Sequence, residues 1–267
     1  GALENLYPGT PLADDIAGTR DSISDITIDN LHENFDLFYH PSQMHLLVIG
    51  KFDVDPILQV LKEYDQISQL PSIKMERFPV EKNEVKLNQS CRMDVATPKL
   101  AIGIRGNDDI KEEEKFRYKL MLKLLFSMMF GWTSQRFQSL YEAGKIDNSL
   151  TLEVEVEELF HFVILTMDTK EPVSLSHQFR SAIKQFDKDP DVNQEHLDTI
   201  KSEMFGDFLQ GLNSLEYSAT QFEYFSDGST SYDLPKILQS ISLQDIIKLG
   251  HKFIDQAEMV DYMIFQK

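Results

Sequence analysis

A run of apolar residues with helical spacing is the feature of this sequence that most constrains its fold. The segment 120–147 begins with LMLKLLFSMMF, breaks at Gly131-Trp132 and ends in a turn at Gly144 that leads into a predicted strand. The polar positions of the predicted helix form one narrow stripe at i, i+4 spacing: Lys115, Lys119, Lys123 and Ser127. A helix that is apolar around most of its circumference is buried on most sides. We therefore predict that it is the central helix of the main domain, and its apolar run is far shorter than the roughly 20 residues of a membrane span.

The charge balance of the chain excludes two classes of partner. The chain has 267 residues with 26 Lys+Arg against 44 Asp+Glu, which gives a formal net charge of -18. Because nucleic acids and anionic membranes both attract a basic face, we expect no nucleic acid and no membrane as partner. Cys91 is the single cysteine, so no internal disulfide can form. With no signal peptide visible in the sequence, this favours a cytoplasmic location.

Hydrophobic periodicity predicts a mixture of helices and strands. A helix capped by Thr27 is predicted over 28–38, and a second helix is predicted after Asp53. Further helices are predicted at 173–186, 193–212, 214–225 and 243–253. Strands are predicted at 44–49, 91–97, 99–105, 150–156, 160–167 and 259–265, with 150–156 and 160–167 as an antiparallel pair. Residues 67–92 contain two prolines and many charges, and we predict that they connect two domains.

An internal repeat emerges when the sequence is shifted by 215 positions, which aligns residues 26–51 with 241–266 without a gap. The shift pairs Thr27 with Ser242 as hydroxyl N-caps, and it pairs apolar residues along both helices and both closing strands. Chance agreement between two helix-and-strand units is the alternative, but the cap, the apolar stripe and the strand all keep register. We therefore predict a true repeat, with the tail of a first copy and a complete second copy in this chain. On the order of 100 or more residues of the first copy would then precede Gly1.

The histidines do not form a metal motif. The sequence has seven of them, and no pair has H-E-x-x-H or H-x-x-E-H spacing. Of two near-misses, one begins at His32 but has Asp36 at its last position, and the other ends at His196 but has Val192 at its first. We predict that both lie on ordinary helix surfaces. Because zinc needs three or four converging ligands, we predict no metal ligand in this chain.

The sequence gives no nucleophile site either, and we predict no catalytic residue. Cys91 lies in a predicted strand with no adjacent base, which is typical of a structural thiol. There is no G-x-S-x-G sequence, and Gly103 and Gly106 lack the strand-turn-helix context of a phosphate loop. The acidic run 112–114 is predicted to begin a helix, where carboxylates favour the positive end of the helix dipole. Glutamates 153 and 155 are predicted on the solvent face of a strand, with a substrate-facing role as the alternative.

Four segments near the start of the chain carry a resemblance to a known family. They are LYP at 6–8, DIAGT at 15–19, FYHPSQM at 38–44 and VIGKFD at 48–53. In this order they resemble the closing part of the first half of the pitrilysin/insulinase family of zinc metallopeptidases. The segment 124–147 resembles the second half of the same family, and the most similar subfamily is the bacterial processing-peptidase-like group.

The resemblance implies an α+β fold of the LuxS/processing-peptidase-like metallopeptidase type, with two homologous sheet-plus-helix halves. Residues 1–70 would form the C-terminal part of a truncated first half, 71–92 a linker, and 93–267 a complete second half. In the family the two halves face each other and enclose a chamber that takes unfolded peptides. The internal repeat agrees with this arrangement, since the two halves are homologous.

The resemblance also implies a cofactor and partners. Members of the family hold zinc through H-x-x-E-H and a distal Glu in the first half, upstream of the Tyr7-Pro8 segment. Zinc would therefore belong to the full-length parent protein, and we expect this chain alone to hold no zinc and to lack peptidase activity. The expected partners are an unfolded peptide substrate and either the missing N-terminal part or a homologous subunit. Apolar surface that the missing part would cover makes a homodimer a further expectation.

Two residues are the candidate substrate-binding positions by resemblance. Active relatives carry a Leu-Arg-x-x-Gly-Leu-x-Tyr type of pattern after the central helix, whose Arg and Tyr help to hold the substrate and the developing oxyanion. Aligned on the Leu and Gly of that pattern, those positions are Tyr141 and Asp147 in this sequence. An ionised Asp147 cannot donate a hydrogen bond to an oxyanion, and Tyr141 can donate one but carries no positive charge. Nearby, Arg136 is expected to face solvent or cap a helix, and Phe137 and Leu140 are expected in the core.

Two functions fit the sequence best. The first is the non-catalytic, C-terminal portion of a zinc-dependent endopeptidase, which walls the chamber and contributes to peptide binding. Its parent would use a zinc-activated water to attack the peptide bond, with the Glu of H-x-x-E-H as general base. The second is a catalytically inactive family member that acts as a partner or assembly subunit, which the altered pair at 141 and 147 favours. An unrelated α/β binding module is a third option, against which the match over 6–53 argues. The presence or absence of H-x-x-E-H upstream of Gly1 separates the first two.

Overall fold

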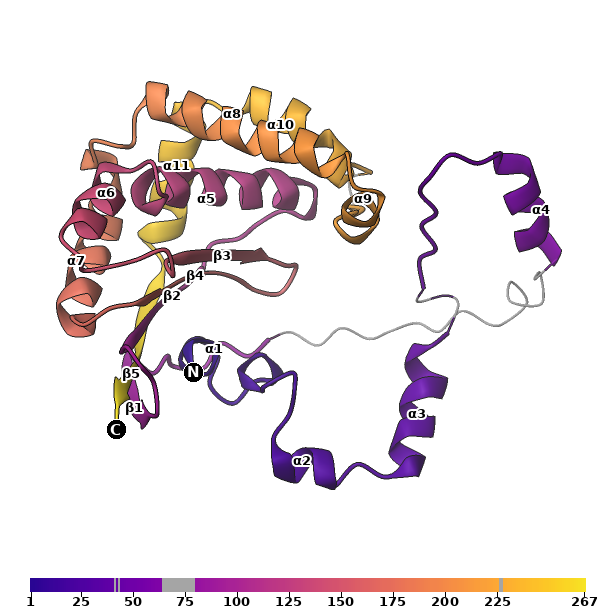
Figure 1. Ribbon diagram of the computed structural model, residues 1–267, viewed down its shortest axis with the longest axis horizontal. Helices are drawn as coiled ribbons and strands as arrows, with labels where there is room; N and C mark the ends of the chain where they lie inside the picture. The colour runs from indigo at the N-terminus through magenta and orange to yellow at the C-terminus, as the bar shows by residue number, and fades with distance from the viewer. Residues whose placement is uncertain (41, 43, 64–79, 226–227) are drawn as a thin grey trace. The chain divides into compact units, whose positions relative to one another are not determined.

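The computed structural model describes residues 1–40, 42, 44–63, 80–225 and 228–267 (Figure 1). Its contacts divide the chain into two compact units. The sheet unit consists of Gly1–Asp14, Val80–Leu209 and Glu223–Lys267, and the helical unit consists of Asp15–Pro79 and Gln210–Phe222. The first segment of the chain thus belongs to the same unit as the sheet. The assignment of 1–70, 71–92 and 93–267 to a truncated half, a linker and a complete half stays a prediction.

The sheet unit is built on one five-stranded sheet with the order β1-β5-β2-β4-β3. The strands are β1 Asn88–Met93, β2 Lys99–Arg105, β3 Thr151–Val156, β4 His161–Asp168 and β5 Glu258–Gln266. β5 pairs in parallel with β1, and the other neighbouring strands pair antiparallel. Helices and a mixed sheet together confirm the predicted α+β class, and β3 pairs with β4 as predicted.

Helix α5, Lys115–Phe130, is the predicted central helix. It lies between the sheet on one side and α8 (Gln194–Gly211) and α10 (Leu234–Ser240) on the other (Figure 1). It also packs against α11, Leu243–Ile254. Several of its side chains are 0% exposed: Leu122, Leu124, Leu125, Phe126, Met128 and Met129. Layers on both sides of α5 explain why apolar residues occupy almost its whole circumference.

The alternation of side chains along β4 builds two cores, one on each face of the sheet. Val163 and Leu165 belong to the large core that contains α5. Phe162 and Ile164 point to the opposite face, where they belong to a smaller core with α1, Ala2–Leu6. Since successive side chains of a strand point to opposite faces, a strand that is covered on both faces is apolar at nearly every position.

The remaining helices include predicted ones whose bounds are shifted and one short helix, α2, that the sequence pattern does not predict. In the sheet unit they are α6 Gln135–Glu142 and α7 Pro172–Lys184. In the helical unit they are α2 Arg20–Ser24, α3 Ile28–Phe38, α4 Val54–Glu63 and α9 Leu215–Thr220. The sequence pattern does not predict α1, α2 or α10, which have at most 7 residues each. Across the described ranges, no helix combines the length and the apolar character that crossing a membrane requires.

The two copies of the predicted repeat share a helix with the same cap. In α3 the Thr27 hydroxyl accepts a hydrogen bond from the Asn30 backbone N–H, and the Asn30 side chain accepts one from the Thr27 backbone N–H. Ser242 and Asp245 form the same capping box at the start of α11. Such reciprocal bonds satisfy two backbone donors that the first turn leaves without partners. The helix of the repeat is therefore confirmed in both copies, and β5 confirms the strand predicted at 259–265.

Two of the predicted strands need correction. The strand predicted at 44–49 is wrong, because those residues have no regular secondary structure. A strand is stabilised by backbone hydrogen bonds to a neighbour, and none of the described segments pairs with 44–49. The strand predicted at 91–97 is shifted, since β1 is Asn88–Met93 and its first residues fall in the predicted linker. Residues 67–79 of the predicted connection lie outside the described residues.

The helical unit carries apolar side chains that its described residues leave exposed. No residue of α3 or α4 is buried. The exposed apolar side chains on these two helices include Ile28, Leu31, Phe35, Phe38, Val54, Leu58 and Leu61. Because an amphipathic helix is stabilised when its apolar face packs against another surface, α3 and α4 each need a covering surface.

The packing of α5 predicts a large difference between two Leu→Ala substitutions. Leu122 is 0% exposed on α5, whereas Leu209 is 47% exposed near the end of α8. Leu122→Ala is expected to lower the free energy of unfolding by about 2–5 kcal/mol, because it removes buried contacts and leaves a cavity. Leu209→Ala is the matched control, with an expected change of about 0.5 kcal/mol. Urea unfolding of both variants measures the difference, and equal losses would contradict the central position of α5.

Candidate functional site

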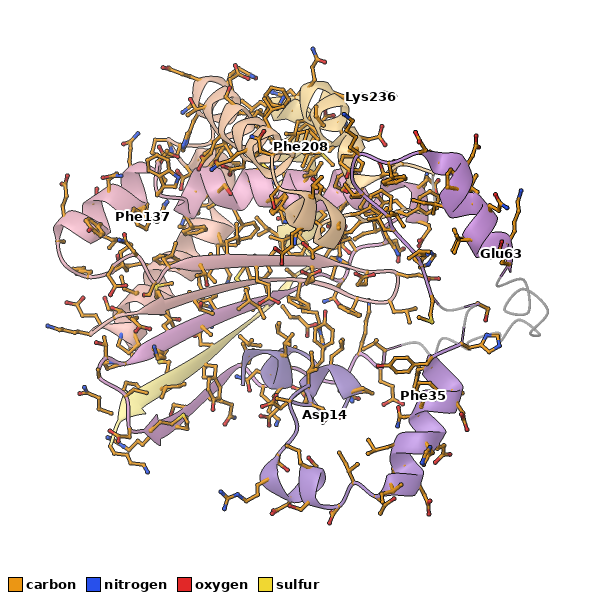
Figure 2. The ribbon with its side chains drawn as sticks, turned by 45° about the vertical axis from the view of Figure 1, so that its right-hand side comes forward. Asp14, Phe35, Glu63, Phe137, Phe208 and Lys236 are labelled. Carbon is orange, nitrogen blue, oxygen red and sulfur yellow. The ribbon has the colours of Figure 1, made fainter. Side chains whose placement is uncertain are left out.

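Of the predicted pair, Tyr141 lies in the last turn of α6 and Asp147 lies on the connection between α6 and β3. Tyr141 is near the end of α6, is 46% exposed, and stacks on Phe137 with ring centroids 5.8 Å apart. Figure 2 shows Phe137 on the same helix. Asp147 is exposed and accepts a hydrogen bond from the Ser149 backbone N–H at 2.9 Å. Tyr141 is thus available to a ligand, and its hydroxyl is the group that it can offer.

The environment of Asp147 favours its ionised form. Hydrogen bonds from the Ser149 side chain and backbone lower the pKa of Asp147 below its ordinary value. At neutral pH this carboxylate is therefore an acceptor only. The structure agrees with the sequence argument that Asp147 cannot donate a hydrogen bond to an oxyanion.

Strand β3, which follows Asp147, forms an edge of the sheet. The Glu157 backbone N–H donates to the Phe160 carbonyl at 2.8 Å, and the register with β4 continues back to Thr151. Because hydrogen-bonded pairs alternate in an antiparallel ladder, the backbone groups of Leu152, Val154 and Val156 point away from β4. In the described part of the chain, no other strand pairs with this edge.

Arg136 is engaged inside the protein rather than facing solvent. Its guanidinium lies 2.6 Å from Asp189 Oδ2, and it donates to the Met129 carbonyl at 3.3 Å. Met129 lies in the last turn of α5, so Arg136 caps the end of that helix. The predicted capping role is confirmed, and the solvent-facing alternative is wrong. Phe137 and Leu140 pack against the large core, as predicted.

The histidines of the two near-misses lie in different settings. His32 is exposed on α3, as predicted. His196 is partly buried, with its Nε2 2.9 Å from Thr133 Oγ1 and its Nδ1 3.0 Å from the Asp191 carbonyl oxygen, so its prediction as plain helix surface is wrong. Among the described residues, no three His, Cys, Asp or Glu side chains converge to hold a metal ion.

A buried polar network that the sequence does not reveal lies just beyond β2. Asp108, which is 6% exposed, accepts hydrogen bonds from the Tyr118 hydroxyl at 3.0 and 2.9 Å, and its Oδ1 lies 2.8 Å from His161 Nε2. Lys252 Nζ lies 3.3 Å from the other carboxylate oxygen. Gly106 leaves the space for His161, because a Cβ there would lie 1.9 Å from His161 Nε2.

The electrostatics of this network favour a charged Asp108 and a neutral Tyr118. Burial alone would raise the pKa of Asp108, but the hydrogen bond and charge of His161, the Tyr118 hydroxyl and Lys252 outweigh it and lower the pKa. Burial, followed by the charge of Asp108, raises the pKa of Tyr118 far above its ordinary value. Among the described residues, the hydrogen-bonded partners of Asp108 are the phenol of Tyr118 and the imidazole of His161, with no serine, threonine or cysteine side chain. This network fixes β4, α5 and α11 to the end of β2, and its residues are too distant in sequence to form a motif.

A second buried network ties the first segment of the chain to the sheet. Arg105 at the end of β2 is buried and donates to the carbonyl oxygens of Leu6 at 2.6 Å and Asn83 at 2.9 Å. Its guanidinium also lies 2.6 Å from Glu258 Oε2 on β5. Because Arg presents several donors in a fixed planar arrangement, one side chain holds three separate segments in place.

Comparison with known proteins identifies the family of this chain. The family described as Peptidase M16 inactive domain matches residues 25–204. This chain belongs to the M16 peptidase family. The uncharacterized zinc protease YmfH of Bacillus subtilis is 32% identical to this M16 chain over 251 residues, which cover 92% of the chain and 58% of that relative. The M16 chain therefore spans less than two thirds of the length of the curated relative.

Solved structures show the same M16 fold. A protein from Alicyclobacillus acidocaldarius described as M16-like peptidase superposes with a TM-score of 0.81 at 20% identity, over 100% of this chain and 64% of that chain. The peptidase M16 inactive domain from Pseudomonas fluorescens gives a TM-score of 0.71 at 15% identity, over 99% of this chain and 63% of that chain. The family match confirms the predicted family, and these superpositions confirm the predicted fold class.

Removing the charge of Asp108 is expected to destabilise this M16 domain at neutral pH. Asp108→Asn leaves the groups that contact the buried carboxylate without their charged partner. The substitution is expected to lower the free energy of unfolding by about 3 kcal/mol. Because the pKa of Asp108 is lowered in the folded state, its contribution is present at pH 7 and is lost as the pH falls below its ordinary value of 3.8. The gap in unfolding free energy between wild type and variant should therefore narrow between pH 7 and pH 3.

Urea unfolding across that pH range measures the effect of the Asp108 substitution. Asp207→Asn, on the exposed surface of α8, is the matched control with little expected change at either pH. A gap that stays constant with pH would show that Asp108 is not held in its charged form.

Proposed function

We propose that this chain is the non-catalytic portion of a zinc-dependent endopeptidase of the M16 family, in which it walls the chamber and contributes to peptide binding. The family match to an inactive domain and the zinc-protease name of the Bacillus subtilis relative support this assignment. The single observation that carries the binding role is the edge strand β3, which Tyr141 and Asp147 precede.

The edge of β3 has the chemistry that an extended peptide needs. The outward backbone groups of Leu152, Val154 and Val156 can pair with a peptide that adds as a further strand. Main-chain pairing is independent of side-chain identity, which suits a site that takes unfolded peptides of varied sequence. Tyr141 is exposed at the end of α6, and its hydroxyl can donate a hydrogen bond to a peptide that extends beyond the strand.

The residues that the structure describes do not offer a zinc site. No three potential ligands converge in the ranges that the structure describes. We therefore assign any zinc of the whole protein to a part outside those ranges, and we give the residues of this chain roles in binding peptide and in walling the chamber. Attack on the peptide bond then belongs to the part of the protein that holds the metal.

A catalytically inactive family member that acts as a partner or assembly subunit is the second candidate. The observation that favours it is the pair at positions 141 and 147, where the family pattern would place Arg and Tyr. Arg136 does not replace the missing cation, because Asp189 and the Met129 carbonyl already engage it.

The whole protein distinguishes these two candidates. For the endopeptidase we expect H-x-x-E-H to be encoded upstream of Gly1, about one zinc per chain, and cleavage of a denatured protein that stops when a chelator removes the metal. The 267-residue chain alone is the control, and it should hold no stoichiometric zinc. A whole protein without the motif and without zinc would favour the inactive subunit.

Tyr141 provides a test of the peptide-binding role. Tyr141→Phe removes the hydroxyl but keeps the ring stacked on Phe137, so the fold should not change. Loss of one hydrogen bond of about 0.5–1.5 kcal/mol should raise the KM of the whole protein for a peptide roughly 2–10-fold, with a smaller effect on kcat. Tyr224→Phe is the matched control, since Tyr224 is also exposed. Equal KM values for the two variants would place the peptide elsewhere.

A further inference from the structure

We propose that the sheet unit has a second peptide site, a groove between α7 and β1 that binds an extended segment with acidic side chains. This groove has a volume of about 650 Å³ and lies wholly within the sheet unit. α7 and the adjacent strands β1 and β5 line it, with His177, Arg180, Lys184, Asn88, Ser90 and Met263 among the lining residues. The site is independent of the proposed function, because β1 and β3 are opposite edges of the sheet.

The strand side of the groove offers free backbone groups. The carbonyl of Leu87 accepts from the Asp261 N–H, and the carbonyl of Met93 accepts from the Lys267 N–H, so the odd-numbered residues of β1 face β5. In a parallel ladder the intervening residues direct both backbone groups to the other side. The backbone groups of Asn88, Ser90 and Arg92 therefore point outward, and no described strand pairs with them.

The helix side of the groove presents a row of basic and polar side chains. His177, Arg180, Ser181 and Lys184 recur at i, i+3, i+4 and i+7 and all line the groove, so they share one face of α7. Lys184 is exposed and, within the described ranges, pairs with no carboxylate. Arg180 already pairs with Asp261, so Lys184 is the groove cation that can meet a carboxylate of a ligand.

Asp261 of β5 contributes a buried acceptor to the same groove. This residue is 4% exposed, and its Oδ2 accepts hydrogen bonds from Ser176 at 2.7 Å and Arg180 at 2.9 Å. Its Oδ1 has no hydrogen-bond partner among the described residues. Because an unsatisfied buried acceptor is costly, a donor N–H that a ligand brings into the groove would be favourable there.

The spacing of the two sides fits an added strand. Arg180 and Lys184 are one helical turn apart, about 6 Å along the axis. Side chains at i and i+2 of a strand share a face and are about 6.6 Å apart. An acidic side chain on that face can therefore lie beside Lys184, and a second one at that spacing would lie next to Arg180, which already pairs with Asp261. Apolar side chains on the same face of the peptide can pack against Val173, Met263 and Phe265, which also line the groove.

Calorimetric titration of the 267-residue chain with a designed peptide tests this site. The probe is a nine-residue peptide in which Asp and Val occupy one face of the strand and Thr the other. Its ends are acetylated and amidated, so its only carboxylates are side chains. We expect saturable binding that weakens as ionic strength rises. A peptide with Asn in place of Asp, and one with a central Pro that cannot add as a strand, should both bind at least about fivefold more weakly.

Three variants test whether the peptide binds in the groove. Lys184→Glu should weaken binding about tenfold, because it reverses one charge of the partly exposed pair between Lys184 and a peptide carboxylate. Lys184→Gln only removes that charge and should weaken binding about threefold. Ser90→Pro removes an outward N–H of β1 that makes no ladder bond, and it should weaken binding similarly while urea unfolding shows that the fold is kept. Lys236→Glu, on α10 (Figure 2), is the control with unchanged affinity.

Several outcomes would overturn the groove site. They are equal affinity of Lys184→Glu and Lys236→Glu, equal affinity of the Asp and Asn peptides, and no saturable heat at millimolar peptide. Tyr141→Phe should leave this affinity unchanged. If that variant weakens binding while Lys184→Glu does not, the peptide binds at β3, which overturns the groove but supports the proposed function.

Discussion

Burial of α5 on nearly all of its sides is the constraint on which the rest of the structure depends. Each fully buried Leu or Phe side chain contributes about 1.5–3 kcal/mol relative to an exposed one, and α5 carries several of them. That gain requires a sheet on one side and α8, α10 and α11 on the other. The two ends of α5 are then fixed by polar contacts, with Tyr118 bound to Asp108 near its start and Arg136 bound to the Met129 carbonyl near its end.

The same constraint decides where ligands can bind. The interior polar groups around Asp108 and Arg105 are occupied by partners from several elements, so they hold the sheet unit together and leave little capacity for substrate. Both faces of the sheet are covered. In the described part of the sheet unit, the outward backbone groups of the two edge strands, β1 and β3, are left without a strand partner. Both proposed sites use main-chain pairing at an edge, with a few side chains from a neighbouring helix to select the ligand.

Much of the fold was predictable because α5, β2–β4 and β5 have strong periodic patterns. The predictions failed where tertiary partners decide. Residues 44–49 have a strand-like composition but no described strand to pair with. β1 begins at Asn88 because its backbone pairs with β5 from that residue onward. The positions of Tyr141 and Asp147 came from family resemblance alone. No sequence signal reveals the groove, since the four α7 residues that line it look like an ordinary solvent face until β1 and Asp261 are placed opposite them.

The place of β5 in the sheet has a consequence for folding during synthesis. β5 is the last of the described strands in sequence, yet it lies between β1 and β2, and it pairs with residues 153–173 positions earlier. Until residues 258–266 have left the ribosome, β1 has no strand to pair with, and one edge of β2 has no hydrogen-bonded neighbour. While residues 106–257 are being synthesised, the nascent chain therefore exposes these strand edges, and unpaired edges favour aggregation. Chaperone binding to this interval would protect the chain until β5 inserts.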